Sequence, residues 1–125
     1  MTDRQPYSID LDNRFGYLEP IDVPALVEAN TERWSNQTLT QVDGSVVRLG
    51  IVEGEFHWHH HDDEDELFFV LDGELEIDVE GRDTVVLRPH QGYNVPRGVE
   101  HRTRARSRTV MLMMSAAGVT PTGSA

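Results

Sequence analysis

Cysteine and lysine are both absent from this chain of 125 residues. Without cysteine, a disulfide framework, a thiolate ligand for zinc and a cysteine nucleophile are excluded. Histidine and carboxylate groups must therefore supply the chemistry of any site. Long apolar runs are also missing, since no stretch approaches the roughly 18 residues of a membrane span. The N-terminal residues lack the apolar core of a secretory signal, so we expect a cytoplasmic protein with no membrane partner.

Positive charge is scarce: eleven arginines stand against 22 acidic residues, and the net charge is −11. An acidic surface repels polyanions, so we expect no nucleic-acid partner. Two origins of the missing lysine stay open, a GC-rich genome or a salt-adapted cytoplasm in which surface acidity keeps proteins dissolved. The length supports one domain with one core, and we expect one site per chain.

Short apolar segments recur between turns such as Asp72-Gly73 and Pro96-Arg97-Gly98. This spacing predicts an all-β sandwich or barrel. The expected strands are 38–42, 45–52, 55–61, 66–71, 74–80, 84–88, 92–96 and 101–114. Polar and apolar residues alternate in 74–80, which predicts one face in the core and one in water. Alternating arginines between 102 and 108 predict a solvated face as well.

The first third of the chain has a different pattern. Residues 1–20 are polar and interrupted by proline and glycine, which predicts an extended arm. Asp22 and Pro24 indicate a helix start, and Leu26, Val27 and Trp34 form an apolar side that would extend the helix to residue 36. We therefore divide the chain into an N-terminal arm and helix (1–36), a barrel (37–117) and a flexible tail (118–125).

Two expected strands are apolar on both faces, Leu67–Leu71 and Val110–Met114. Such strands need cover on two sides. The N-terminal arm and helix could provide it, and so could a second subunit. We expect a homodimer as the more economical arrangement.

Three histidines and a glutamate have the spacing of metal ligands. His59 and His61 lie two residues apart in a segment expected to be extended, so their imidazoles point to one face. Glu66 follows an acidic run long enough for a turn, and His101 follows a later turn. Nitrogen and oxygen ligands suit Fe, Mn, Ni, Co or Zn. We predict one divalent ion per chain, bound by His59, His61, Glu66 and His101.

Two explanations without a specific metal site stay open for this histidine-rich segment. It could bind metal loosely, as a tag does, or its histidines could hydrogen-bond to the acidic run with no ion. Its internal position, interleaved with Phe56 and Trp58, argues for folded structure. On a regular strand His57 would share the face of His59, which would place His57 beside the metal as a hydrogen-bond donor or as a general base. Glu66 is the second candidate catalytic residue. Alternatively, His57 only fills the barrel mouth.

The histidine-rich segment and the residues after it resemble the first motif of the cupin superfamily. His59-x-His61, four residues, Glu66, six residues and Gly73 match that pattern. Gly54 lies one residue too close to His59 for the glycine that opens the motif.

The second cupin motif is also represented. Pro96-x-Gly98 followed by His101 matches its centre, whereas His90 and Ala105 stand where the motif has glycine and asparagine. The resemblance covers about residues 45–115. It implies a double-stranded β-helix, that is, a jelly-roll barrel, with a metal at the four ligand positions and a small-molecule ligand. Small cupins of this kind are commonly homodimers, so the resemblance also implies a homodimer.

The superfamily contains many activities, so the resemblance names no reaction. Four protein ligands on an octahedral ion leave two positions for a ligand. We therefore expect an enzyme that oxidises or isomerises a small oxygen-rich molecule by inner-sphere coordination. The alternative is a non-catalytic, metal-containing module that binds a sugar or organic acid. A purely structural metal is less favoured, because structural sites are closed by four strong ligands.

Overall fold

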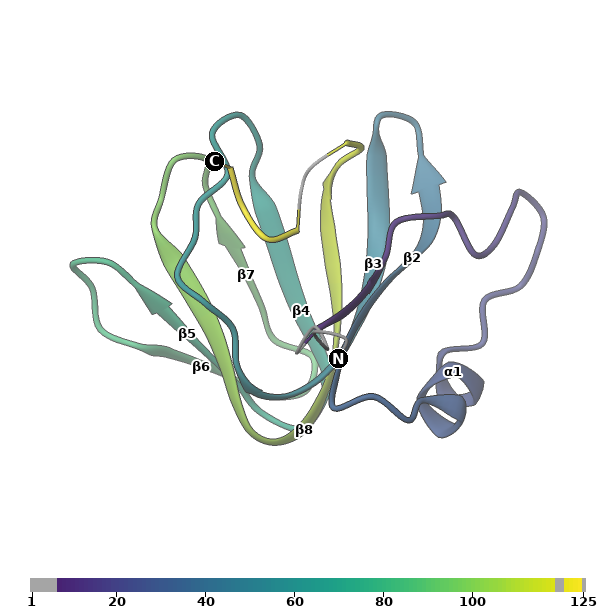
Figure 1. Cartoon of the computed structure of the whole chain (residues 1–125), viewed down its shortest axis with the longest axis horizontal. Coiled ribbons are helices and arrows are strands. Elements are labelled where there is room, and N and C mark those ends of the chain that lie inside the picture. Colours follow the sequence, from purple (N-terminus) through teal and green to yellow (C-terminus); the bar gives the residue numbers. More distant parts are fainter. Residues whose placement is uncertain (1–6, 119–120, 125) are drawn as a thin grey trace, which may run out of the picture.

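The computed structural model describes residues 7–118 and 121–124 and contains one short helix and eight strands within them (Figure 1). The elements are β1 (Ser8–Asp10), α1 (Val23–Ala29), β2 (Trp34–Val42), β3 (Ser45–Glu55), β4 (Glu66–Asp72), β5 (Leu75–Val79), β6 (Val85–Leu87), β7 (Gly92–Val95) and β8 (His101–Ala116). The predicted all-β jelly roll is confirmed. The described helix has seven residues, far short of what a bilayer crossing requires.

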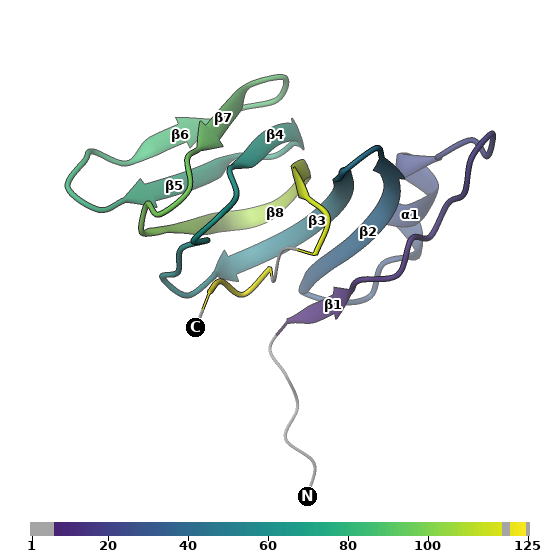
Figure 2. The same cartoon turned by 90° about the horizontal axis from the view of Figure 1, so that it is seen from above.

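Strand β8 joins the parts of the sheet. One edge of β8 pairs antiparallel with β3, and the other edge is shared, with β5 along 101–104 and β4 along 110–114. β2 extends the sheet beyond β3, and β7 extends it beyond β4. The sheet does not close completely, but Figures 1 and 2 show the strands curling around a common interior.

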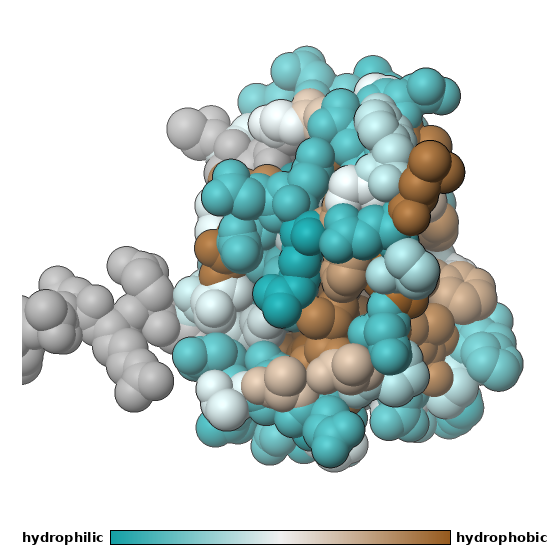
Figure 3. Space-filling view, turned by 90° about the vertical axis from the view of Figure 1, so that its right-hand side faces the viewer, coloured by the Kyte–Doolittle hydropathy of each residue, from teal (hydrophilic) through white to brown (hydrophobic). Residues whose placement is uncertain are grey.

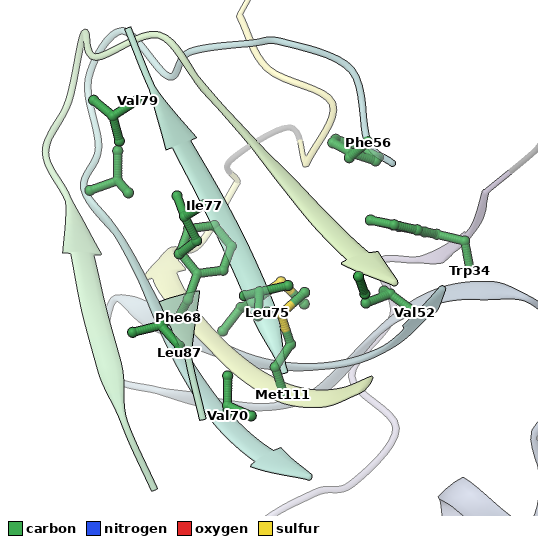
Figure 4. Packing of buried hydrophobic residues seen from close by; sticks show 13 residues of the cluster. Trp34, Val52, Phe56, Phe68, Val70, Leu75, Ile77, Val79, Leu87 and Met111 are labelled. Carbon is green, nitrogen blue, oxygen red and sulfur yellow. The ribbon is translucent and has the colours of Figure 1, made fainter. Parts of the chain in front are cut away.

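The core fills this interior. Val70, Leu75 and Ile77 have no exposed surface, and they pack with Phe68 and Met111 in the cluster of Figure 4. Burial of this apolar surface is the main stabilising contribution to the fold. It also places aromatic and methionine side chains directly beside the histidines of the candidate site.

Helix α1 is shorter than the sequence predicts. Asp22 caps its start by accepting a hydrogen bond from Ala25 N, and Asn30, in an extended conformation, ends it. Trp34 was expected on the helix, but it opens β2 and stacks on Phe56 with ring centroids 5.3 Å apart. The extension to residue 36 is therefore wrong, because burial of the indole in the barrel outweighs the local helical pattern.

The helix covers part of the outer sheet face. Leu26 packs with Leu49, Ile51 and Val110 in a second apolar cluster. Beyond this cluster Met114 remains 44% exposed, and Figure 3 shows hydrophobic side chains gathered on the side of the molecule that bears α1. The helix thus covers part of the second face of the apolar strands, as one of the two expected arrangements requires. The homodimer stays a prediction.

The polar face of β5 is covered rather than solvated. Glu76 and Asp78 are 9% and 8% exposed, and the arginines of β8 lie across them. Arg104 donates to Asp78 from Nε at 2.6 Å and from Nη2 at 2.9 Å, and Arg102 donates from Nε at 2.8 Å. Arg106 reaches Glu76 at 3.3 Å. The predicted solvated face of β5 is therefore wrong, because the arginines of β8 neutralise and cover its acidic side chains. On β8 itself, Arg106 and Arg108 are exposed as predicted.

This cluster predicts a stability effect. Asp78→Ala should lower the free energy of unfolding by about 2–3 kcal/mol, because charged hydrogen bonds from Arg102 and Arg104 are lost together. Urea denaturation measures the change. The matched control is Glu55→Ala, whose exposed carboxylate accepts one bond from Arg102 and should contribute less than about 0.5 kcal/mol. Equal losses in the two variants would contradict the assignment.

Candidate metal centre

The structure brings the four predicted metal ligands together. His59 and His61 lie in the segment between β3 and β4, Glu66 is the first residue of β4, and His101 is the first residue of β8. One ligand atom from each residue lies within 4.8 Å of all the others. All four side chains belong to buried residues. Two separated parts of the chain therefore meet in one group of donors.

The strand predicted over 55–61 does not form. β3 ends at Glu55, just after Gly54 with its φ of 106°. What remains of the pairing with β8 is a hydrogen bond of 3.0 Å from Phe56 N to Thr103 O and one bridge, in which His59 and His101 exchange backbone hydrogen bonds of 2.9 Å in each direction. This bridge fixes the two backbones against each other, and His61 O accepts a further bond of 2.8 Å from Gly98 N. His59 and His61 are thus positioned by backbone hydrogen bonds to Gly98 and His101, and not by a regular strand.

Backbone carbonyls orient two of the imidazoles. His59 Nδ1 lies 3.0 Å from His57 O, and His101 Nδ1 lies 2.9 Å from Val99 O. A carbonyl can only accept, so each Nδ1 carries the hydrogen. Each Nε2 then presents a lone pair to the centre of the group, which is the tautomer that metal-binding histidines use.

The centre contains buried polar atoms without a hydrogen-bond partner. His61 Nε2 and His101 Nε2 are of this kind among the described residues. Their contacts with Glu66 Oε1, at 3.3 and 3.5 Å, are too long for good hydrogen bonds. Such orphaned atoms are rare in a protein interior and need a reason. A divalent cation among the four donors would satisfy all of them, so the residues fit a metal.

The electrostatics of the site suit a cation as well. Burial lowers the pKa of His59 to about 4, so its imidazole is neutral at physiological pH. Burial by itself would raise the pKa of Glu66, but its polar contacts with His101 and His61 outweigh that effect and lower the pKa to about 2. A neutral imidazole and an ionised carboxylate are the forms that bind metal.

The lowered pKa of His59 predicts acid sensitivity of the metal-free protein. The unfolded chain takes up a proton near pH 6.5, whereas the folded chain resists it until about pH 4. The free energy of unfolding should therefore fall as the pH drops through this window, by about 2–3 kcal/mol between pH 7 and 4.5. Urea denaturation at several pH values measures this slope. His59→Gln should flatten it, and an unchanged slope in that variant would contradict the prediction.

His57, the predicted general base, lies beside the four ligands and not among them. Its ring is exposed, stacks on Phe56 with centroids 4.3 Å apart, and is 5.4 Å from the ring of His59. His57 Nε2 lies 2.8 Å from Thr122 O. Because the carbonyl accepts, the hydrogen is on Nε2 and the basic lone pair is on Nδ1. Its catalytic role stays a prediction.

A small cavity of about 20 Å³ adjoins the predicted metal ligands His59 and Glu66. Its other walls are mostly apolar and come from β2, β3, the segment after β3, β4, β8 and the C-terminal segment: Trp34, Asn36, Val52, Phe56, Phe68, Thr103, Met111, Met113 and Pro121. The sequence predicted Phe68 in the interior but missed Asn36 and Pro121. A strand beginning at Trp34 would have placed Asn36 on the same face, whereas nothing in the sequence pointed to Pro121.

Comparisons with known proteins agree with this geometry. A family model described as Cupin domain matches residues 45–116. The uncharacterized protein YdbB of Bacillus subtilis is 43% identical over 88 residues, which cover 70% of this chain and 78% of YdbB. A crystal structure of a cupin-2 domain containing protein from Shewanella frigidimarina is 30% identical, with a TM-score of 0.70 over 75% of this chain and 91% of that chain. A Bacillus halodurans structure, 16% identical, has a TM-score of 0.68 over 90% of each chain.

Proposed function

This chain belongs to the Cupin domain family, and from that premise we propose that His59, His61, Glu66 and His101 bind one divalent metal ion that anchors a small oxygen-rich molecule. The orphaned Nε2 atoms of His61 and His101 carry this proposal. Three imidazoles and one carboxylate suit Fe, Mn, Ni, Co or Zn without selecting among them. The bound ion would polarise a ligand oxygen at positions that the protein leaves open.

The residues around the predicted ion favour catalysis over binding without turnover. The apolar walls exclude water, which strengthens electrostatic interactions at the site. His57 offers a basic Nδ1 beside His59, and Glu66 is held ionised. We propose that His57 accepts a proton from the bound molecule during its isomerisation or its oxidation by dioxygen. The alternative function is a ligand-binding module in which the ion holds a sugar or organic acid without turnover.

One experiment separates these two functions. Protein loaded with Fe(II), Mn(II) or Co(II) is incubated in D2O with a panel of small hydroxy acids, keto acids and aldoses. Proton NMR detects isomerisation through deuterium incorporation, and an oxygen electrode detects oxidation. We expect metal-dependent turnover that falls at least about tenfold in His57→Ala, with the metal retained. Binding of a panel member to the Co(II) protein without any turnover would favour the module.

We also propose a homodimer formed through the outer faces of β4 and β8. Leu67 pairs with Met114 and Phe69 with Leu112 in the register of these strands, so apolar side chains lie next to one another there. Sedimentation velocity should give the mass of two chains for the wild type. Leu67→Glu should give one chain, and Leu18→Glu, at an exposed loop position, should leave the dimer intact. A cytoplasmic location stays a prediction.

A further inference from the structure

Asn36 ends in a buried polar atom that has no partner. The side chain comes from β2, only 9% of the residue is exposed, and Oδ1 makes no hydrogen bond with any described residue. Opposite Asn36 in the sheet register is Gly50, where a Cβ would lie within 3.0 Å of Met111 and Met113. The methionine side chains therefore occupy the space beside Gly50 and leave Asn36 facing the cavity that it lines.

The cavity beside Asn36 has a size and composition that suggest an occupant. About 20 Å³ is enough for one water-sized group. Glu66 and His59 line the same cavity, so a molecule anchored at the metal would extend toward Asn36. Phe56, Phe68 and the two methionines offer this group only apolar contacts. An acceptor in such a pocket discriminates strongly, because an apolar group in its place leaves the acceptor unpaired.

We propose that Asn36 is a specificity residue that accepts a hydrogen bond from a hydroxyl group on the metal-anchored ligand. The ligand class is then a small hydroxylated acid or sugar whose hydroxyl lies beyond the oxygen that the metal holds. This inference rests on the proposed function, since the metal provides the anchor. A hydroxyl both fits the one-water space and satisfies Oδ1, whereas a methyl group fits the space alone.

The test compares two probes that differ in this one group, 3-hydroxypropanoate and butanoate. Their dissociation constants are measured by titrating the Co(II)-loaded full chain and following its visible absorption. The wild type should prefer 3-hydroxypropanoate by about tenfold, which is the worth of one buried hydrogen bond. Asn36→Leu should reduce the preference to within about twofold. Asn36→Thr, which keeps a hydroxyl acceptor, should retain part of it, and Asn94→Leu, at an exposed position on β7, should keep it whole.

The outcomes separate this inference from the function on which it rests. If neither probe changes the Co(II) spectrum, the proposed function fails and the inference fails with it. If both probes bind but the wild type has no preference, or Asn36→Leu keeps it, the Asn36 inference alone is overturned. Asn36→Leu should also raise the melting temperature of the metal-free protein, because an unpaired buried acceptor is removed. That second measurement shows that the variant folds.

The C-terminal segment Pro121–Ser124 lies across the histidine segment and carries a second inference. Ser124 N donates to His60 O at 2.7 Å, and Ser124 Oγ accepts from Asp62 N at 2.9 Å. Gly123 packs so closely that a Cβ there would lie 2.7 Å from His59 Cβ. Pro121 is buried and forms one wall of the cavity. The family match ends at residue 116, so this segment lies beyond the matched residues.

We infer that this segment is a removable lid over the candidate metal centre. With Pro121 in place the cavity holds one water-sized group, so a ligand of several atoms enters only after Pro121 withdraws. Among the described residues, three hydrogen bonds hold the lid: Ser124 donates one and accepts one, and His57 donates one to Thr122 O. The packing of Pro121 and Gly123 adds to them. Segments held by so few contacts open at low free-energy cost.

Trp34 reports on the lid without any metal, because it lines the cavity and is only 6% exposed. In a Trp58→Phe background, which removes the other tryptophan, acrylamide quenching of Trp34 is measured in the full chain. Gly123→Val should increase the quenching constant at least about threefold, because the added side chain collides with His59. The matched control is Gly81→Val, also at positive φ but with open space around it, and it should leave quenching unchanged. Unchanged quenching in Gly123→Val would overturn the lid.

Discussion

Replacing His101 with alanine should remove nearly all of the tightly bound metal. Wild-type protein expressed without a tag should contain about one divalent ion per chain, whereas His101→Ala should lower the affinity for Co(II) or Mn(II) by about 100-fold or more. The reason is geometric: the variant loses the imidazole whose orphaned Nε2 lies among the other three donors, while the backbone bridge to His59 stays in place. Elemental analysis gives the content, and equilibrium dialysis gives the affinity.

The control for this experiment addresses the loose histidine-tract explanation. His60 lies between two of the ligands in sequence, but its ring nitrogens contact Asp62 at 3.0 Å and Glu100 at 3.1 Å instead. His60→Ala should therefore keep about one ion per chain. Loss of metal in both variants would support a diffuse tract, and full metal content in His101→Ala would remove the four-ligand assignment.

Gly73→Ala should be strongly destabilising. Gly73 has a φ of 84°, and a Cβ there would lie 2.6 Å from Thr109 Oγ1 and 2.7 Å from Arg108 O. Thr109 cannot easily move, because its hydroxyl donates to Glu74 O at 3.0 Å and accepts from Glu74 N at 3.1 Å. Left-handed backbone strain and overpacking together should lower the free energy of unfolding by about 3–4 kcal/mol. Urea denaturation measures the loss.

Gly81 provides the comparison, since its φ of 78° is similar but nothing lies within 4 Å of a Cβ. Gly81→Ala should cost only the backbone strain of about 1 kcal/mol. If the two variants lose the same stability, the close approach of Thr109 and Arg108 to Gly73 contributes nothing, and the prediction is wrong.

The sequence predicted which residues gather at the candidate metal centre better than the elements that carry them. The residues that gather could be identified because their spacing is that of metal ligands: His59, His61, Glu66 and His101. The strand assigned to 55–61 was wrong because local alternation does not reveal where pairing partners end. In the described part of the chain, the segment pairs with β8 through the His59–His101 bridge and one hydrogen bond from Phe56 N to Thr103 O, both of them contacts between residues far apart in the sequence.

Non-local contacts explain the other errors as well. Trp34 continued a helical pattern locally, but the indole packs against Phe56 from another strand. The acidic face of β5 was expected in water because polar and apolar residues alternate clearly along the strand. In the folded protein, arginines of the neighbouring strand β8 cover this face. Asn36 was missed for a related reason: an asparagine in a strand has no distinctive pattern, and its proposed role rests on the unpaired atom and the cavity in the folded protein.

The shared pairing of β8 has a consequence for the order of assembly during translation. The pairs β2–β3, β4–β7 and β5–β6 can form as the nascent chain leaves the ribosome, but β8, the last described strand, is the partner that connects them. Until residues 101–116 emerge, the edges of β3, β4 and β5 remain open to pairing with other chains. His101 opens this strand, so completion of the sheet and completion of the predicted ligand set belong to the same stage of biosynthesis.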